Sequence, residues 1–223
     1  MVGGGVQRPE DSKISKILSL AVPTTKKEVR SLLGVLNYYR KFVSNFSAIS
    51  APLSDLTKGG QPDKVVWTSE CQDALEALQA VMSSKPVLVL PDIRFPFVLR
   101  TDASDRGLGA TLLQPRCDDG DEILHPVIYA SRKLLDREMK YGIGERECLS
   151  IVWGVTKLSR YLYGREFVIE TDHAPLRVLE KQTSHSGRLS RWALTLQQFK
   201  FQVRPISGVV NSLADILSRC PAS

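Results

Sequence analysis

Through most of the first ninety or so residues, hydrophobic positions recur every three or four residues, which is the period of an amphipathic helix. The pattern predicts helices over about 26–42, 46–57 and 68–83. The first of them begins with capping-box spacing at Thr25 and Glu28. A short apolar run at 87–90 follows, and Pro91-Asp92 marks the expected end of a mainly helical module.

From about residue 95 the hydrophobic period changes to two, which is the period of a β-strand. Strands are predicted over about 95–101, 107–114 and 125–131, with an acidic turn at 117–121. The remaining elements are predicted as a helix at 144–161, a strand at 167–171, a helix from about 173, a helix at 187–198, a strand at 199–204 and a helix at 211–219. The pattern therefore predicts an α/β domain at 92–223, a helical module at 23–91 and an N-terminal lead segment at 1–22.

Composition describes an ordinary globular chain of 223 residues, 43% hydrophobic and 24% charged. No apolar stretch reaches the length of a membrane span, and the N-terminus has no signal-peptide core, so we expect an intracellular protein of the cytoplasm or nucleus with no membrane partner. The 4 cysteines are scattered without a CxxC pair, which indicates reduced thiols rather than a zinc site. The net charge of +6 mildly favours a polyanionic partner but decides nothing alone.

Lysines and arginines gather on the polar face of the first predicted helix. Lys26, Lys27 and Arg30 lie on this face, and Arg40 and Lys41 continue it. Such a row is suited to lie along a phosphate backbone. The alternative is the solvated face of a helix that packs on its other side.

Four carboxylates stand in contexts that would direct them at a common point: Asp102, Glu147, Asp172 and Asp215. Asp102 and Asp172 each follow an apolar strand, so pairing of these strands would place both at matching ends. The other two lie in predicted helices beside apolar stripes. Any one of them alone is equally well explained as a surface or capping carboxylate. Together they would repel, and hard oxygen ligands favour magnesium or manganese as the counter-charge.

Several segments resemble, in order, the ribonuclease H domain of gypsy-type long-terminal-repeat retrotransposon polyproteins: TDASDRGLGATLLQ, YGIGERECLSIVW, FVIETDHAPLRVL, GRLSRWALTLQQFKFQV and GVVNSLADILSR. The stretches TTKKEVRSLLGVLNYYRKFVSNFSAISAPLSDL, VVWTSECQDALEAL and KPVLVLPD resemble the thumb and connecting region of the same reverse transcriptases. The resemblance covers about 5–219. It implies a ribonuclease H-like mixed sheet of five strands flanked by helices and preceded by a helical, thumb-like module.

The resemblance also implies a chemistry. Asp102, Glu147, Asp172 and Asp215 fall at the metal-binding D-E-D-D positions of the family. Two Mg²⁺ ions, or Mn²⁺, would be held about 4 Å apart, with Asp102 bridging them, and the RNA strand of an RNA:DNA hybrid would be cut to a 3′-hydroxyl and a 5′-phosphate. Glu145 competes for the second position, but residues two apart on a helix point about 200° from each other and cannot share one metal pair.

Further residues are predicted by the same resemblance or by their chemistry. His173 follows the third aspartate and would orient a phosphate or assist product departure, although it equally suits the start of a helix. No histidine lies between 187 and 215, where retroviral enzymes use one. The candidates for contacting the hybrid, beyond the basic helix face, are Ser104, Arg106, Gly107, Arg188, Arg191 and Asn211. Turn or capping duty explains Gly107 and Asn211 equally well.

No YxDD polymerase motif occurs in the chain, so polymerisation is not expected of it. The chain reads either as a piece of a larger polyprotein or as a domesticated retroelement gene of a host. The alternative to an active nuclease is a captured module that binds hybrids or proteins and has little catalytic activity. Such a module would act as a homodimer or with a host protein partner. A purely structural connection domain would be expected to lack the acids that this chain retains.

Overall fold

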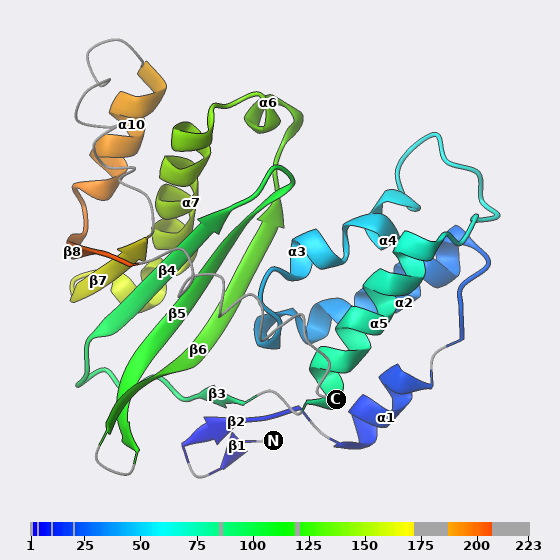
Figure 1. Cartoon of the computed structure of the whole chain (residues 1–223), viewed down its shortest axis with the longest axis horizontal. Coiled ribbons are helices and arrows are strands. Elements are labelled where there is room, and N and C mark those ends of the chain that lie inside the picture. Colours follow the sequence, from blue (N-terminus) through cyan, green and yellow to red (C-terminus); the bar gives the residue numbers. More distant parts are fainter. Residues whose placement is uncertain are drawn as a thin grey trace.

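The structure is a computed structural model that describes residues 2–3, 5–9, 11–19, 21–84, 87–118, 121–171 and 187–206. A five-stranded sheet has the order β6-β5-β4-β7-β8. Its strands are β4 (Phe97–Ala103), β5 (Gly107–Asp118), β6 (Asp121–Lys133), β7 (Glu166–Thr171) and β8 (Lys200–Pro205). β4, β5 and β6 pair antiparallel, whereas β7 lies parallel to both β4 and β8. This mixed sheet with flanking helices confirms the predicted α/β class (Figure 1).

The helices near the sheet are α6 (Asp136–Met139), α7 (Ile143–Lys157), α8 (Ser159–Leu162) and α10 (Gly187–Leu196). α7 packs closely on the strands because Gly154 has no side chain to hold it off. A Cβ on Gly154 would lie 3.1 Å from Thr101 Cγ2 and 3.2 Å from Ala110 Cβ. Thr101 and Ala110 are direct partners in the ladder of β4 and β5, so this face of the sheet is the one that α7 covers.

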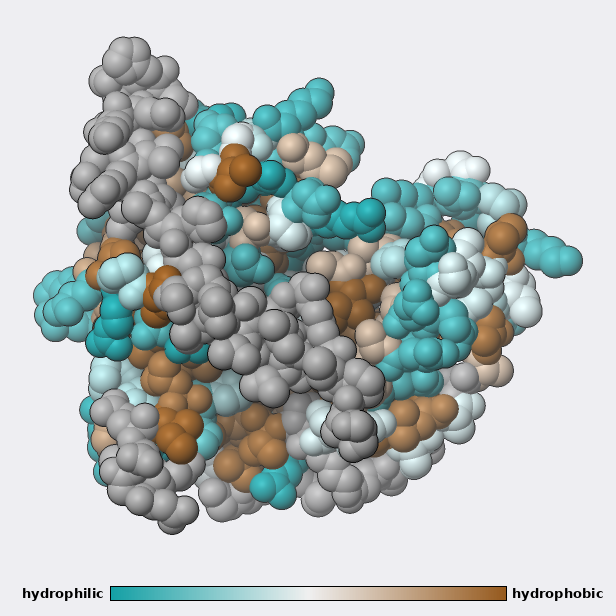
Figure 2. Space-filling model, viewed as in Figure 1, coloured by the Kyte–Doolittle hydropathy of each residue, from teal (hydrophilic) through white to brown (hydrophobic). Residues whose placement is uncertain are grey.

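The N-terminal part of the chain forms a helical module on the other side of the sheet (Figure 1). Its elements are α1 (Asp11–Leu18), α2 (Lys26–Tyr38), the 3₁₀-helix η1 (Arg40–Phe42), α3 (Phe46–Ile49), α4 (Ala51–Asp55) and α5 (Ser69–Ser83). The predicted capping box is present, since Thr25 Oγ1 accepts from the Glu28 amide at 3.3 Å and Glu28 Oε2 accepts from the Thr25 amide at 3.3 Å. Figure 2 shows hydrophilic residues over α5, as an amphipathic helix with a buried apolar side requires.

The structure differs from the sequence-based expectations at three places. The helix predicted at 46–57 is divided into α3 and α4, because Pro52 is tolerated only in a first helical turn. β5 continues to Asp118 and β6 begins at Asp121, so the acidic turn between them is shorter than the predicted 117–121. The lead segment contains β1 (Val2–Gly3) and β2 (Val6–Gln7), which form a small sheet with β3 (Leu88–Val89).

Two large clusters of buried side chains hold these parts together. One lies between the five-stranded sheet and α7 and includes Leu99, Ile151 and Ile169. The other lies within the helical module and includes Leu36, Leu53 and Leu78. None of the described helices is both long and apolar enough to cross a membrane. The helices predicted from about 173 and at 211–219 lie outside the described residues.

Candidate functional site

Asp102 is exposed and lies one residue before the end of β4. It pairs directly with Gly109 on β5, and its neighbour Thr101 pairs with Ala110. Successive residues of a strand point to opposite faces of the sheet. Because Thr101 and Ala110 face α7, Asp102 lies on the face turned toward the helical module.

Glu147 lies in α7 and is only 6% exposed. Its backbone carbonyl accepts a hydrogen bond from Ser150 Oγ at 2.7 Å. Burial, and then the negative charges of Glu147 and Glu145, raise the pKa of the neighbouring Cys148 thiol to about 12. The raised pKa of Cys148 and the low exposure of Glu147 show that this part of α7 is buried away from water.

The first turns of α7 are tied to the loop that follows Asp102. Arg146 Nη1 donates a hydrogen bond to the backbone carbonyl of Ser104 at 3.2 Å. Arg146 immediately precedes Glu147, and Ser104 comes two residues after Asp102. The two described carboxylates therefore come from segments that touch each other.

β4 and β7 are parallel neighbours, which confirms the predicted pairing of the two strands that precede Asp102 and Asp172. Arg100 stands level with Glu170 in this pair, and Arg100 Nε donates to Glu170 Oε2 at 2.7 Å. Arg204 on β8 also reaches Glu170, with Nη1 to Oε1 at 3.4 Å. A buried carboxylate with cationic partners thus joins three strands immediately before their ends.

Four predicted residues, Asp172, His173, Asn211 and Asp215, lie outside the described residues. Among the residues that are described, no three His, Cys, Asp or Glu side chains form a group that could hold a metal ion. The described part of the chain supplies two of the four predicted ligands, so the complete metal site stays a prediction.

The loop between β4 and β5 is a tight turn built around Ser104. Ser104 Oγ accepts hydrogen bonds from the amides of Gly107 at 2.9 Å and Arg106 at 3.2 Å. A Cβ on Gly107 would come within 2.9 Å of the backbone oxygen of Arg132. Ser104 and Gly107 therefore have structural duties in the turn, while Arg106 is exposed. Their predicted contact with nucleic acid stays a prediction.

Arg188 links α10 to α7. It pairs with Glu145, and its guanidinium lies 4.0 Å from the centre of the Tyr141 ring. Glu145 also accepts from the Gly142 amide at 3.3 Å, so this carboxylate is used in capping α7 and pairing Arg188. That use supports the choice of Glu147 over Glu145 as the metal ligand. Arg188 and Arg191 border an open pocket of about 410 Å³, which is also lined by Arg137, Glu138, Tyr141, Leu149 and Trp192.

The predicted basic helix face is divided by the structure. Lys27 and Arg30 are exposed on α2, and Lys26 Nζ donates to the Lys58 carbonyl at 3.2 Å. Arg40 is also exposed, but it lies in η1, beyond the end of α2. Its Nη2 donates to the Ser131 carbonyl on β6 at 2.5 Å, because η1 turns the chain toward the sheet.

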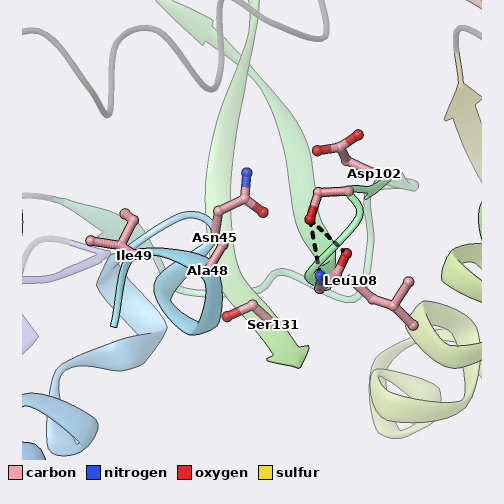
Figure 3. Close-up of a pocket in the computed structure, with 8 residues that line it drawn as sticks. Asn45, Ala48, Ile49, Asp102, Leu108 and Ser131 are labelled. Atoms are coloured by element: carbon pink, nitrogen blue, oxygen red, sulfur yellow. Dashed lines mark hydrogen bonds between the residues drawn. The ribbon is translucent and has the colours of Figure 1, made fainter. Parts of the chain in front are cut away.

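One pocket beside Asp102 contains residues that the sequence did not indicate. It has a volume of about 310 Å³ and lies between α3 and the strands β4, β5 and β6 (Figure 3). Asn45 lines it from the helical module with a left-handed backbone, φ 50°. Asparagine is the non-glycine residue that adopts this conformation most readily, but no sequence pattern shows which strand it meets.

Comparisons with known proteins assign the class of this fold. Residues 92–199 match the family described as the RNase H-like domain found in reverse transcriptase. The foamy viral protease-reverse transcriptase in complex with RNA/DNA hybrid superposes with a TM-score of 0.73 at 23% identity, over 88% of this chain and 27% of that chain. The foamy viral protease-reverse transcriptase dRH in complex with double-stranded DNA gives a TM-score of 0.72 at 24% identity, over 88% of this chain and 35% of that chain. At these identities the likeness shows the fold alone.

The curated relatives are more similar in sequence. The retrovirus-related Pol polyprotein from transposon 297 of Drosophila melanogaster is 39% identical over 213 residues, which is 95% of this chain and 19% of the polyprotein. That from transposon gypsy of the same fly is 35% identical over 95% of this chain and 21% of its own length. The transposon Tf2-3 polyprotein of Schizosaccharomyces pombe is 35% identical over 95% and 16%.

The fold and the match over 92–199 define a protein with the RNase H-like domain of reverse transcriptases. More particularly, the chain is homologous over 95% of its length to a segment of the Pol polyproteins of gypsy-type and Tf2 retrotransposons. It spans about a fifth of the length of these relatives.

Proposed function

We propose that this chain is an endoribonuclease that hydrolyses the RNA strand of RNA:DNA hybrids. The observation that carries the proposal is the hydrogen bond from Arg146 Nη1 to the Ser104 carbonyl, which ties the segment that holds Glu147 to the loop that follows Asp102. The family match over 92–199 and the hybrid bound by the foamy viral enzyme support the same substrate. In this proposal the nuclease domain is 92–223, preceded by the helical module at 23–91 and the lead segment at 1–22.

The described residues fit a divalent cation. Asp102 and Glu147 offer the hard oxygen donors that a divalent cation prefers. Asp172 and Asp215 would complete the ligand set for two Mg²⁺ ions, or Mn²⁺. When bound, the two ions supply the positive charge that favours ionisation of the attacking water and stabilises the leaving oxygen.

The residues of the chain itself would set the geometry of this site. Asp172 follows Thr171 at the end of β7, the parallel neighbour of β4, so the order of the chain supports placing it near Asp102. The ion pair of Arg100 and Glu170 keeps these strands aligned. Phosphates or sugars of the hybrid would be contacted by the exposed cations of α2 and by His173, Ser104, Arg106, Arg191 and Asn211. Arg188 would support α10 rather than grip a phosphate, because Glu145 already neutralises it.

Cleavage of a labelled RNA:DNA hybrid tests the proposal, beside matched double-stranded DNA and double-stranded RNA, in Mg²⁺ and in Mn²⁺. We expect hybrid-selective cutting that Asp102→Asn and Glu147→Gln each abolish. Glu145→Gln is the matched control, two residues away in the same helix, and should retain most of the cleavage. A folded wild-type protein that binds the hybrid without cutting it would instead support the captured binding module.

A further inference from the structure

The carboxamide of Asn45 fills the space that a side chain at Gly109, directly opposite Asp102, would occupy. Gly109 is the direct partner of Asp102 in the ladder of β4 and β5. A Cβ on Gly109 would lie closer than 3.0 Å to Asn45 Oδ1. Direct partners of this kind have Cβ atoms about 5 Å apart. Asn45, from the helical module, therefore stands beside Asp102 as a cross-strand neighbour would.

Asn45 and Asp102 also line the same cavity of about 310 Å³ (Figure 3). The other residues around it are Ala48, Ile49, Ser104, Gly107, Leu108 and Ser131. With a share of about 30 Å³ for each water, the cavity has room for a sugar-sized group and too little for a base pair. Its walls join apolar carbon with a few polar groups, which suits a ribose.

Hydrogen bonds to β6 fix the position of Asn45. The Ser47 amide donates to Ser131 Oγ at 2.9 Å, close to Asn45 in the chain. Farther along the module, Lys133 Nζ donates to the Ala51 carbonyl at 3.2 Å and to Asp55 Oδ1 at 2.5 Å. The cavity wall that Asn45 provides is therefore held against the sheet, as recognition of a single hydroxyl requires.

We propose that Asn45 is a specificity-determining residue whose carboxamide binds the ribose 2′-hydroxyl of the RNA nucleotide seated beside Asp102. A carboxamide both donates and accepts, which matches a hydroxyl, and it is neutral, so it leaves the charge of the neighbouring carboxylates available. The inference rests on the proposed nuclease function. It makes the site composite, because one of its side chains comes from outside the matched region 92–199.

Asn45→Gly is the sharpest variant, since glycine keeps the left-handed backbone and removes only the carboxamide. Cleavage is compared on an all-ribose hybrid and on hybrids with a single 2′-deoxy nucleotide at each position around the cut. We expect the wild type to lose roughly tenfold at one position, the factor that one hydrogen bond contributes. Asn45→Gly should cleave the all-ribose hybrid about tenfold more slowly than the wild type does. The 2′-deoxy substitution at that one position should then cause no further loss of cleavage by Asn45→Gly.

A second readout avoids catalysis. In the Asp102→Asn background, fluorescence anisotropy compares binding of the hybrid with binding of double-stranded DNA of the same sequence. Asn45→Gly should reduce the preference for the hybrid and leave the affinity for DNA unchanged. Asn37→Ala, which removes an exposed asparagine from α2 of the same module, is the matched control and should change neither.

The outcomes separate the two proposals. If the wild type cuts no hybrid in either metal, the nuclease function fails and the role of Asn45 fails with it. If the wild type cuts, but Asn45→Gly has unchanged cleavage or an additive loss with the 2′-deoxy substitution, only the role of Asn45 is overturned. Thermal unfolding followed by circular dichroism confirms that each variant is folded.

Discussion

Arg100 and Glu170 form an ion pair across two parallel strands, with Nε and Oε2 2.7 Å apart and side-chain exposures of 18% and 5%. The pair lies two residues before Asp102 on β4. Arg204 on β8 approaches the other carboxylate oxygen at 3.4 Å but is 63% exposed. The sheet is therefore fastened by a buried charge pair at the edge where the candidate metal ligands begin.

Removal of one partner of this pair should be costly. Arg100→Met leaves the Glu170 carboxylate buried with only the distant Arg204, and we expect a loss of about 3 kcal/mol in the free energy of unfolding. The double variant Arg100→Met with Glu170→Met removes both charges and should be markedly more stable than Arg100→Met alone. Urea unfolding measures both, and Arg204→Met serves as the exposed control. Equal stability of Arg100→Met and the wild type would contradict this role.

Substitutions of Glu145 and Glu147 should have different effects on the stability of the metal-free protein. Glu145→Gln weakens the pair with Arg188 and the cap of α7, and we expect a loss of about 1 kcal/mol because these groups are partly exposed. Glu147→Gln keeps the size of the buried side chain and removes its charge, so we expect a smaller loss than for Glu145→Gln in the metal-free protein. Thermal unfolding in EDTA compares the two. A larger loss for Glu147→Gln than for Glu145→Gln would show that Glu147 is a structural residue.

Gly107 and Gly109 offer a matched pair of glycine-to-alanine changes in one strand. Gly107→Ala forces a methyl group against the backbone oxygen of Arg132, and we expect a loss of about 2 kcal/mol. Gly109→Ala meets only the end of the Asn45 side chain, which can rotate away, so stability should change by less than about 1 kcal/mol. Displacement of the carboxamide should nevertheless reduce hybrid cleavage as Asn45→Gly does. Full activity of a folded Gly109→Ala protein would argue against the role of Asn45.

Acid should weaken the attachment of the helical module to the sheet. Burial opposes ionisation of Asp55, but the hydrogen bonds and charges of Lys133 and Lys58 outweigh it and lower the pKa of this carboxyl below its ordinary 3.8. A lowered folded-state pKa adds stability above the ordinary pKa, and that stability is lost as the pH falls through the folded-state value. We expect a contribution below about 1 kcal/mol, since Asp55 is half exposed.

The measurement for Asp55 is the free energy of unfolding between pH 7 and pH 2.5. Lys133→Met should reduce the part of the acid-induced loss that belongs to Asp55. Lys64→Met, which removes an exposed lysine of the same module, should leave the pH dependence as in the wild type. Identical pH profiles for Lys133→Met and the wild type would show that this ion pair adds nothing to stability.

The spacing of hydrophobic residues predicted most of the described elements, because it shows which face of each helix or strand must be buried. It correctly indicated the helix at α7 and the pairing of the strands that precede Asp102 and Asp172. It missed β1, β2, α1 and α6, since two-residue strands and short helices carry too few positions to show a period. The capping box at Thr25 was predictable for the same local reason that it forms.

The sequence by itself determined most of the elements, the α/β class and the candidates for the carboxylates, because each of these depends on residues close together in the chain. Only the tertiary structure decided that Arg40 donates to the Ser131 carbonyl, that Glu170 is paired with Arg100, and that Asn45 stands beside Asp102. These contacts join segments from about 50 to 90 residues apart. Their geometry follows from how the module and the sheet close on each other, which no local pattern encodes.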